Sequence, residues 1–200
     1  MKRSLVRSSV SATEPIDTTA CNLHLKVQST VEDSLLAIYI KAARLQCENI
    51  IRRALLPTSF ALYMDRFYDD FSLPMPPISS SSTDLVITYL DSTGGTSTVS
   101  ATNYVVDYNS EPGRVFLATS GVWPSDILDT ENAVKVAYRA GYTTANLPEN
   151  ARVWLMQRVG VLYKYREPVI NINVSELPRN FIDGLLDDLV VYDEHDYNMS

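Results

Sequence analysis

The longest regular pattern in the chain is a helical one over residues 30–55, "TVEDSLLAIYIKAARLQCENIIRRAL". Its apolar residues recur at intervals of three and four, the spacing that places side chains on one face of an α-helix. One row contains Val31, Leu35, Ile38, Ala42 and Leu45, and a second set widens it: Leu36, Tyr39, Ala43, Cys47, Ile50 and Ile51. A stripe this wide predicts a helix that is buried on more than one side.

Both ends of this helix carry local signals. Thr30 followed by Asp33 resembles a capping box, with Asp in place of the usual Glu or Gln. Pro57 ends the helix, because proline lacks the backbone N–H that the helical hydrogen bond needs.

After Pro57 the hydrophobic period changes from helical spacing to alternation and short apolar runs, which are typical of strands. We expect strands over residues 58–67, 85–90, 96–108, 115–118 and 133–140. The segment "DSTGG" at 91–95 predicts a tight hairpin turn between two of them. In the last run, Val134, Val136 and Tyr138 should face one way and Lys135 the other. These segments predict a β insertion of about five or six strands over residues 58–140.

A second long helix is predicted over residues 148–166, with Pro148 at its first turn and Glu149 complementing the helix dipole. Its aromatic residues include Trp154, Tyr163 and Tyr165. Gly160 in its middle costs about 1 kcal/mol relative to Ala, and this cost predicts close approach by another backbone.

Three further segments complete the plan. Residues 17–27 predict a short helix capped by Asp17 or Thr18, and residues 175–192 predict a last amphipathic helix. The fold class expected is therefore α+β: a helical bundle of about four helices, with a β-strand insertion between the second and third long helices and a C-terminal arm. The expected domains are a flexible N-terminal arm, a body and a C-terminal arm with an acidic tail: residues 1–14, 15–166 and 167–200.

Composition excludes several classes of protein. The net charge of −7 argues against a protein that grips nucleic acid through phosphates, because such proteins cluster Lys and Arg. Cys21 and Cys47 have no metal-ligand spacing and are expected to be buried thiols in a reducing compartment. No apolar run approaches the roughly 20 residues that cross a bilayer. We therefore expect a soluble protein, cytoplasmic when synthesised and without a membrane partner.

The candidate chemical residues do not form a recognisable constellation. His24 is expected to be a half-buried helix residue, and His195 lies among tail acids where it would hold a metal weakly at most. Asp69 and Asp70 are adjacent in the chain and so should point apart, which disfavours acid–base work. Trp123 and Trp154 are more suited to packing than to stacking on a sugar or base. We therefore predict no catalytic residue, no metal site and no cofactor. Abundant apolar surface without reactive groups is typical of an assembly component.

The order of motifs resembles the head–tail connector, or adaptor, proteins of tailed bacteriophages, which are head-completion proteins. Three stretches carry the resemblance: "VEDSLLAIYIKAARLQCENIIRRAL", "TNYVVDYNSEPGRVFL" and "AVKVAYRAGYTTANLPENARVWLMQRVGVLYKYRE". The final "LPRNFIDGLLDDLVVY" is also similar to the family's last segment, so the resemblance covers residues 15–192. The chain departs from the family at Arg52-Arg53, where Gly-Arg is common, and in its acidic extension after Tyr192.

The resemblance implies a structural protein of the virion neck, assembled in the host cytoplasm, and not an enzyme. It implies a homo-oligomeric ring, usually a dodecamer, that joins the portal protein above to a tail or nozzle protein below while genomic DNA passes through the lumen. The helix over 148–166 would pack on the helix over 30–55, with Trp154, Tyr163 and Tyr165 serving the core or the contact between subunits. The C-terminal arm would reach the portal, through the apolar residues Leu177, Phe181, Leu185, Leu186, Leu189 and Tyr192.

Three alternatives remain open at this point. A ring protein that completes the tail instead of the head would have a similar construction. A hydrolase using Asp69 or Asp70 is a second alternative. A carbohydrate-binding module is a third, because the Trp and Tyr content is compatible with it.

Overall fold

The computed structural model describes residues 3–81, 83–166 and 184–192. The chain divides into two compact units. The β unit takes in residues 3–11, 56–141 and 191–192, and the helical unit takes in residues 12–55, 142–166 and 184–190. Each unit has its own buried side chains, so the two are described in turn.

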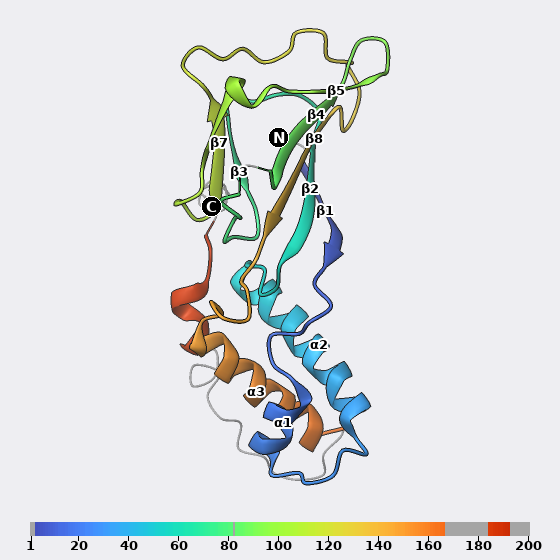
Figure 1. The fold of residues 1–200 in the computed structure, drawn as a ribbon, viewed down its shortest axis with the longest axis vertical. Helices are drawn as coiled ribbons and strands as arrows, with labels where there is room; N and C mark the ends of the chain where they lie inside the picture. Colours follow the sequence, from blue (N-terminus) through green and yellow to red (C-terminus); the bar gives the residue numbers. More distant parts are fainter. Residues whose placement is uncertain (1–2, 82, 167–183, 193–200) are drawn as a thin grey trace, which may run out of the picture. The chain divides into compact units, whose positions relative to one another are not determined.

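The β unit contains two antiparallel sheets (Figure 1). The five-stranded sheet has the order β1-β2-β8-β4-β5 and the three-stranded sheet the order β3-β7-β6. A short 3₁₀ helix, η1 (Ala101–Asn103), precedes β6. The strands are β1 (Arg3–Val10), β2 (Thr58–Met64), β3 (Asp70–Leu73), β4 (Leu85–Leu90), β5 (Thr96–Thr98), β6 (Tyr104–Asp107), β7 (Gly113–Leu117) and β8 (Val134–Ala140).

Alternation of side chains builds the core of this unit. Val134, Val136 and Tyr138 of β8 are buried, while Lys135 and Arg139 are exposed, as the sequence pattern predicts. The register sets β8 between its neighbours, with Val136 opposite Leu62 of β2 and Ile87 of β4. Tyr138 stacks on Phe60, with 5.6 Å between ring centroids, and its hydroxyl donates a 2.7 Å hydrogen bond to the Pro74 carbonyl.

Glycine is required where the chain leaves β8. Gly141 has a φ of +112°, a conformation that residues with a Cβ rarely adopt. A Cβ built at this position would lie 1.9 Å from the carbonyl oxygen of Leu56, closer than any real contact. The turn after β8 therefore depends on the missing side chain of Gly141.

The helical unit contains α1 (Thr18–Leu25), α2 (Asp33–Ile51), α3 (Glu149–Lys164) and the 3₁₀ helix η2 (Gly184–Leu189). Asp17 caps α1 as predicted, since its carboxylate accepts a 2.7 Å hydrogen bond from the Ala20 N–H. The predicted capping box at Thr30 and Asp33 is wrong. Helix α2 begins later, at Asp33, whose carboxylate instead accepts a 2.8 Å hydrogen bond from the Asn22 side chain.

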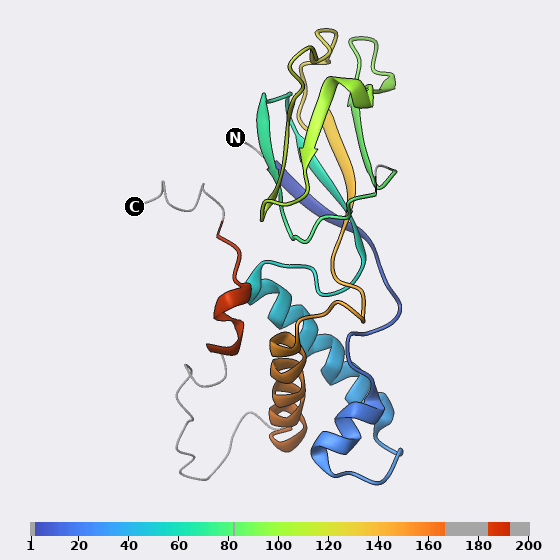
Figure 2. The same cartoon turned by 60° about the vertical axis from the view of Figure 1, so that its left-hand side comes forward.

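Helices α2 and α3 pack side by side, as expected, and the two views agree (Figure 1 and Figure 2). Helix α1 packs against both, and η2 packs on α2 and α3. Gly160 of α3 faces side chains of α1 and not a backbone, because its nearest neighbours are Leu25 and His24. The shared core is apolar, and its members include Leu36, Ile40, Ile51, Leu55, Trp154, Leu155, Val159 and Leu186.

The expected fold class needs correction. The chain is α+β, but the expected helical bundle with an inserted sheet is wrong. The described residues contain eight strands in two antiparallel sheets, against three α-helices and two short 3₁₀ helices. The physical reason is that the strand segments form a core of their own. Phe60, Leu62, Val115 and Val136, for example, are fully buried within the β unit.

Two strands fall where the sequence analysis placed none. Residues 3–10, expected to belong to a flexible arm, form β1 and pair with β2 along its length. Residues 70–73 form β3, which pairs with β7. The predicted strand over 96–108 is divided into β5 and β6, with η1 before β6.

Candidate protein–protein interfaces

The residues expected to contact a portal divide into three groups. Leu177 and Phe181 lie outside the described residues. Leu186 is only 1% exposed and belongs to the core of the helical unit, and Leu185 and Leu189 pack against that core. Tyr192 is 61% exposed. Within the described part of the C-terminal segment, Tyr192 is therefore the residue of this set most available to a partner.

Arg53 fastens η2 to the rest of the helical unit. Its Nε donates a 2.6 Å hydrogen bond to the carbonyl oxygen of Leu189, and its Nη1 donates a 3.3 Å bond to the Tyr142 hydroxyl. Arg53 is buried, so on folding its guanidinium replaces hydrogen bonds to water with hydrogen bonds to these two acceptors. Arg53 thus makes a structural contact, whereas the position at which the chain departs from the Gly-Arg pattern is Arg52.

Helix α2 has two apolar faces that differ in burial. Its inner face packs in the core through Leu36, Ile40, Ala43, Cys47 and Ile51. On the opposite side lies what we call the α2 outer row: Val31 just before the helix, then Ile38, Ala42 and Leu45. Val31 is 85% exposed, Ile38 64% and Leu45 39%, and Ala42 is also exposed. Apolar residues in a continuous exposed row on one helix mark a candidate contact surface.

Helix α3 also presents a row to the outside, which we call the α3 outer row: Asn150, Val153, Gln157, Val161 and Lys164. Successive members are three or four residues apart, so they share one side of the helix. Val153 and Val161 are each 37% exposed. Between them, the side-chain oxygen Oε1 of Gln157 is buried and has no hydrogen-bond partner.

The three aromatic residues predicted for α3 have different surroundings. Trp154 is buried in the core. The Tyr163 hydroxyl donates a short hydrogen bond to the Glu32 carboxylate, which also accepts a 2.8 Å bond from Nη2 of Arg166. These bonds, that from Tyr163 foremost, hold the pKa of Glu32 below its ordinary value. Tyr165 is half-buried, with the Lys164 ammonium 5.3 Å from its ring centroid.

A buried ionic network joins α2 to the segment before α1. Arg44 donates through Nε to Glu14 Oε2 at 2.6 Å and through Nη1 to Glu48 Oε2 at 3.2 Å. The second oxygen of Glu48 accepts the Leu55 N–H at 2.9 Å. Arg44 and Glu48 are almost fully buried, so the pair is satisfied on both sides, as a buried charge requires.

The residues considered for chemistry serve other purposes in the structure. His24 is exposed on α1, although it was expected to be half-buried, and His195 lies outside the described residues. The Asp70 carboxylate pairs with the Arg114 guanidinium across β3 and β7. Within residues 3–81, 83–166 and 184–192, no three His, Cys, Asp or Glu side chains gather in a way that could hold a metal. No helix in these ranges is both long and apolar enough to span a membrane.

Both cysteines are free and buried, as predicted. Burial raises the pKa of the Cys21 thiol to about 11 and that of the Cys47 thiol to about 12. Both groups therefore stay protonated, and so weakly reactive, near neutral pH.

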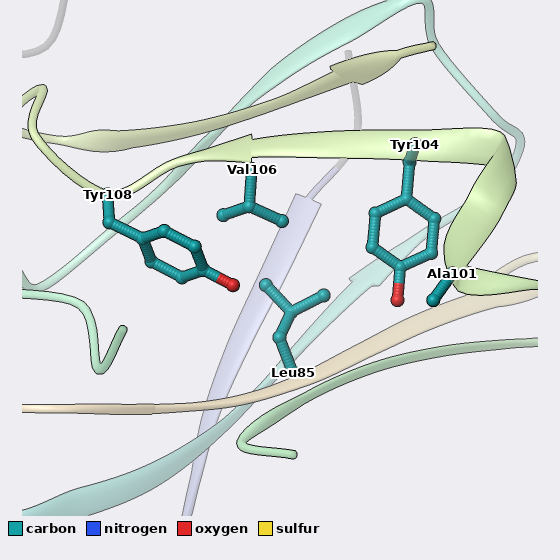
Figure 3. A pocket seen from close by; sticks show the side chains of 5 residues that line it. All are labelled: Leu85, Ala101, Tyr104, Val106 and Tyr108. Atoms are coloured by element: carbon teal, nitrogen blue, oxygen red, sulfur yellow. The ribbon is translucent and has the colours of Figure 1, made fainter. Parts of the chain in front are cut away.

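The β unit has an aromatic cluster beside a small cavity. Trp123 stacks on Phe67, with 4.9 Å between ring centroids, and lies 6.5 Å from Tyr104. The cavity, of about 170 Å³, lies between β4 and β6, so the two sheets face each other there (Figure 3). It is lined by Leu85, Ala101, Tyr104, Val106 and Tyr108. Its volume corresponds to one ring-sized group, well below the 300–1,000 Å³ or so of typical ligand pockets.

The members of the α2 outer row are visible in the sequence, but their role is not. The helical spacing of residues 30–55 predicts burial on more than one side, and within the described residues only one side is buried. The α3 outer row has a weaker signal, because Val153 and Val161 alone are apolar in it. Neither row could be assigned to the outside without knowing which face of each helix meets the other.

Comparison with known proteins gives matches at the level of structure alone. No protein-family model matches the chain, and no curated protein matches it. A solved structure described as the neck of an empty GTA particle computed with C6 symmetry has a similar chain, with a TM-score of 0.76 and 18% identity. That alignment covers 95% of this chain and 96% of the other.

Two related structures give the same result. A chain in the virion of a native gene transfer agent (GTA) particle has a TM-score of 0.72 at 17% identity. A chain in the neck of a native GTA particle computed with C12 symmetry has a TM-score of 0.67 at 16% identity. Each alignment covers 94% of this chain and 96% of the other. The chain thus shares its whole fold, both units included, with a component of these particles.

Proposed function

We propose that this protein is a structural component of the neck of a tailed-phage-like particle. The observation that carries the proposal is the fold match, because it runs over 94–95% of this chain and 96% of the other chain in particle structures. A match confined to a common domain would carry little functional weight, since one fold serves many functions. A match through both units in the same order is far more specific.

More narrowly, we propose an adaptor that forms a ring of identical copies below the portal and joins the capsid to the tail. The sequence resemblance to head–tail connector proteins supports this role. So do the exposed apolar rows on α2 and α3, which suit contacts with other polypeptides. The C6 and C12 symmetries belong to the neighbouring structures, and a dodecamer is the number we propose for this chain. The net charge of −7 suits a ring through which DNA slides without being held.

The portal contact is proposed to involve the C-terminal segment. Leu185, Leu186, Leu189 and Val190 pack within the helical unit and Val191 is buried, so Tyr192 is the residue to test. We expect Tyr192→Asp to weaken binding to the portal and to leave the fold intact, while Asp188→Asn at another exposed position changes neither. Portal binding by Tyr192→Asp as tight as that of the wild type and of Asp188→Asn would exclude this contact.

The direct test of the function is electron microscopy of the protein mixed with its cognate portal-bearing particles. We expect ring-shaped density made of this protein immediately below the portal. The alternative, a ring that completes the tail, predicts density at the tail end instead. A monomer that binds neither structure would overturn both proposals. We propose no catalytic function, and the pairing of Asp70 with Arg114 across β3 and β7 supports a structural role for that carboxylate.

A further inference from the structure

We infer that the α2 outer row of one copy packs against the α3 outer row of the next copy around the ring. This inference rests on the proposed function, because it requires identical copies in a closed arrangement. It assigns the contact to named residues of the helical unit, where the proposed function specifies only that copies associate.

The two rows are placed as a ring contact requires. At about 100° per residue, Ile38 and Leu45 lie roughly half a turn around α2 from Leu36 and Ile40 of its buried face. On α3, Val153, Val161 and Lys164 are exposed and lie more than a quarter turn around the helix from the buried Leu155 and Val159, while Val161 flanks the buried Trp154. Because α2 and α3 pack through their buried faces, their outer rows lie on opposite sides of the pair. A cyclic ring needs two different patches on each subunit, facing in different directions, and the two rows satisfy this condition.

The side chains of the rows are compatible with helix–helix packing. Ala42 lies between the larger Ile38 and Leu45, which leaves a shallow hole between two apolar knobs. Val153 and Val161 on α3 are apolar residues of a size that fits such a surface. The α2 outer row is apolar throughout, and Lys164 is the one charged member of the α3 outer row, so contact between them would bury little charge.

The experiment uses one charged substitution in each row. Ile38→Asp alters the α2 outer row and Val161→Asp the α3 outer row. Ala37→Asp is the matched control, because Ala37 is exposed on the same helix but about 100° away from Ile38. Native mass spectrometry measures assembly of the full chain, alone at high concentration and on portal-bearing particles. Thermal unfolding followed by circular dichroism confirms that each variant is folded.

We expect each row variant alone to remain monomeric, with the contact between copies weakened about 100-fold or more, because an unpaired charge is buried in it. Ala37→Asp should assemble like the wild type. A mixture of the two row variants should stop at dimers, because each mixed dimer has one intact pair of rows and no second one. This outcome separates a head-to-tail contact from a symmetric one between two α2 rows.

The contrary outcomes are distinct. Rings formed by Ile38→Asp would overturn the inference and leave the proposed function standing. Assembly by Val161→Asp but not by Ile38→Asp would show that α2 packs on something other than the α3 row. If the wild type assembles neither alone at high concentration nor on portal-bearing particles, both the inference and the proposed function are overturned. If Ile38→Asp lowers the unfolding temperature, Ala42→Arg replaces it, because Arg favours helix and still adds bulk and charge to the row.

Discussion

The two faces of α2 are similar in composition and opposite in exposure. Ile40 on the inner face is 2% exposed, and Ile38 on the outer face is 64% exposed, two residues away on the same helix. The inner face obtains its stability from α3, α1 and η2, all within the same chain. Apolar content alone therefore does not locate the core of this chain. One face of such a helix stabilises the fold, and the other remains available for a second chain.

The largest loss in the free energy of unfolding is expected from the buried ion pairs of Arg44, on the inner side of α2. Arg44→Met removes the cation between Glu14 and Glu48 and leaves the Glu48 carboxylate buried without it. Breaking one side of a buried ion pair costs about 3–5 kcal/mol. Urea unfolding should show a loss of this size, and Lys41→Met, an exposed cation on the same helix, should cause almost none. A loss below about 1 kcal/mol for Arg44→Met would mean that the network contributes little.

The second prediction applies one substitution to both faces. Ile40→Ala should lower the free energy of unfolding by about 2–5 kcal/mol, because it removes buried methyl groups and leaves a cavity. Ile38→Ala should change the stability of the monomer by no more than about 0.5 kcal/mol, since its side chain is mostly in water. Urea titrations of dilute protein measure both values. Equal losses for the two variants would contradict the assignment of the faces.

The third prediction concerns the anchor of η2 on the inner side. Arg53→Leu removes the donors to the Leu189 carbonyl and the Tyr142 hydroxyl. Leaving such acceptors unpaired costs about 1–3 kcal/mol, and the loss should fall mainly on η2. Hydrogen exchange of Arg53→Leu should be faster than that of the wild type for the amides of residues 184–190, with a smaller change for the amides of α2. Unchanged protection of those amides would show that apolar packing of Leu186 alone holds η2.

The smallest effect on stability is expected where Glu32 accepts hydrogen bonds from Tyr163 and Arg166, because these side chains are partly exposed. Because the pKa of Glu32 is held below its ordinary value near 4.5, its contribution to stability is present above that pH and is lost as the pH falls further. Tyr163→Phe removes the leading hydrogen bond, so the pKa of Glu32 should rise toward 4.5. An NMR titration of the Glu32 carboxyl measures this change, with Tyr165→Phe as the control. An unchanged titration would mean that Arg166 alone sets the pKa.

Local signals in the sequence predicted the three α-helices and much of the β unit, whereas the described part of the helix predicted over residues 175–192 is only the short 3₁₀ helix η2. The spacing of α2 and α3, the Asp17 cap, the Gly94 turn between β4 and β5, and the alternation of β8 all depend on neighbouring residues. Such features can be read from a short window of the chain.

The features that were missed depend on distant residues. Strand β1, "RSLVRSSV", has little apolar alternation and forms because it pairs with β2, whose partner residues lie 48 to 61 positions further along the chain (Val10 with Thr58, Arg3 with Met64). The predicted capping box does not form. The Asp33 carboxylate accepts a hydrogen bond from the Asn22 side chain of α1, a residue outside the local motif. The inner face of α2 is likewise decided by α3, about a hundred residues further along the chain. The pairing of a strand without apolar alternation, or the choice between two apolar faces of a helix, has no signature in a short window of sequence.

Cross-linking can show which surfaces of neighbouring copies touch. A chain carrying both Ile38→Cys and Val161→Cys presents one thiol in each outer row, while the native Cys21 and Cys47 stay buried and protonated. After mild oxidation of the proposed rings, we expect a ladder of covalent multimers on a non-reducing gel, whereas each single Cys variant should give at most a dimer. Intact rings that yield only monomers from the double variant would contradict the contact between the two rows.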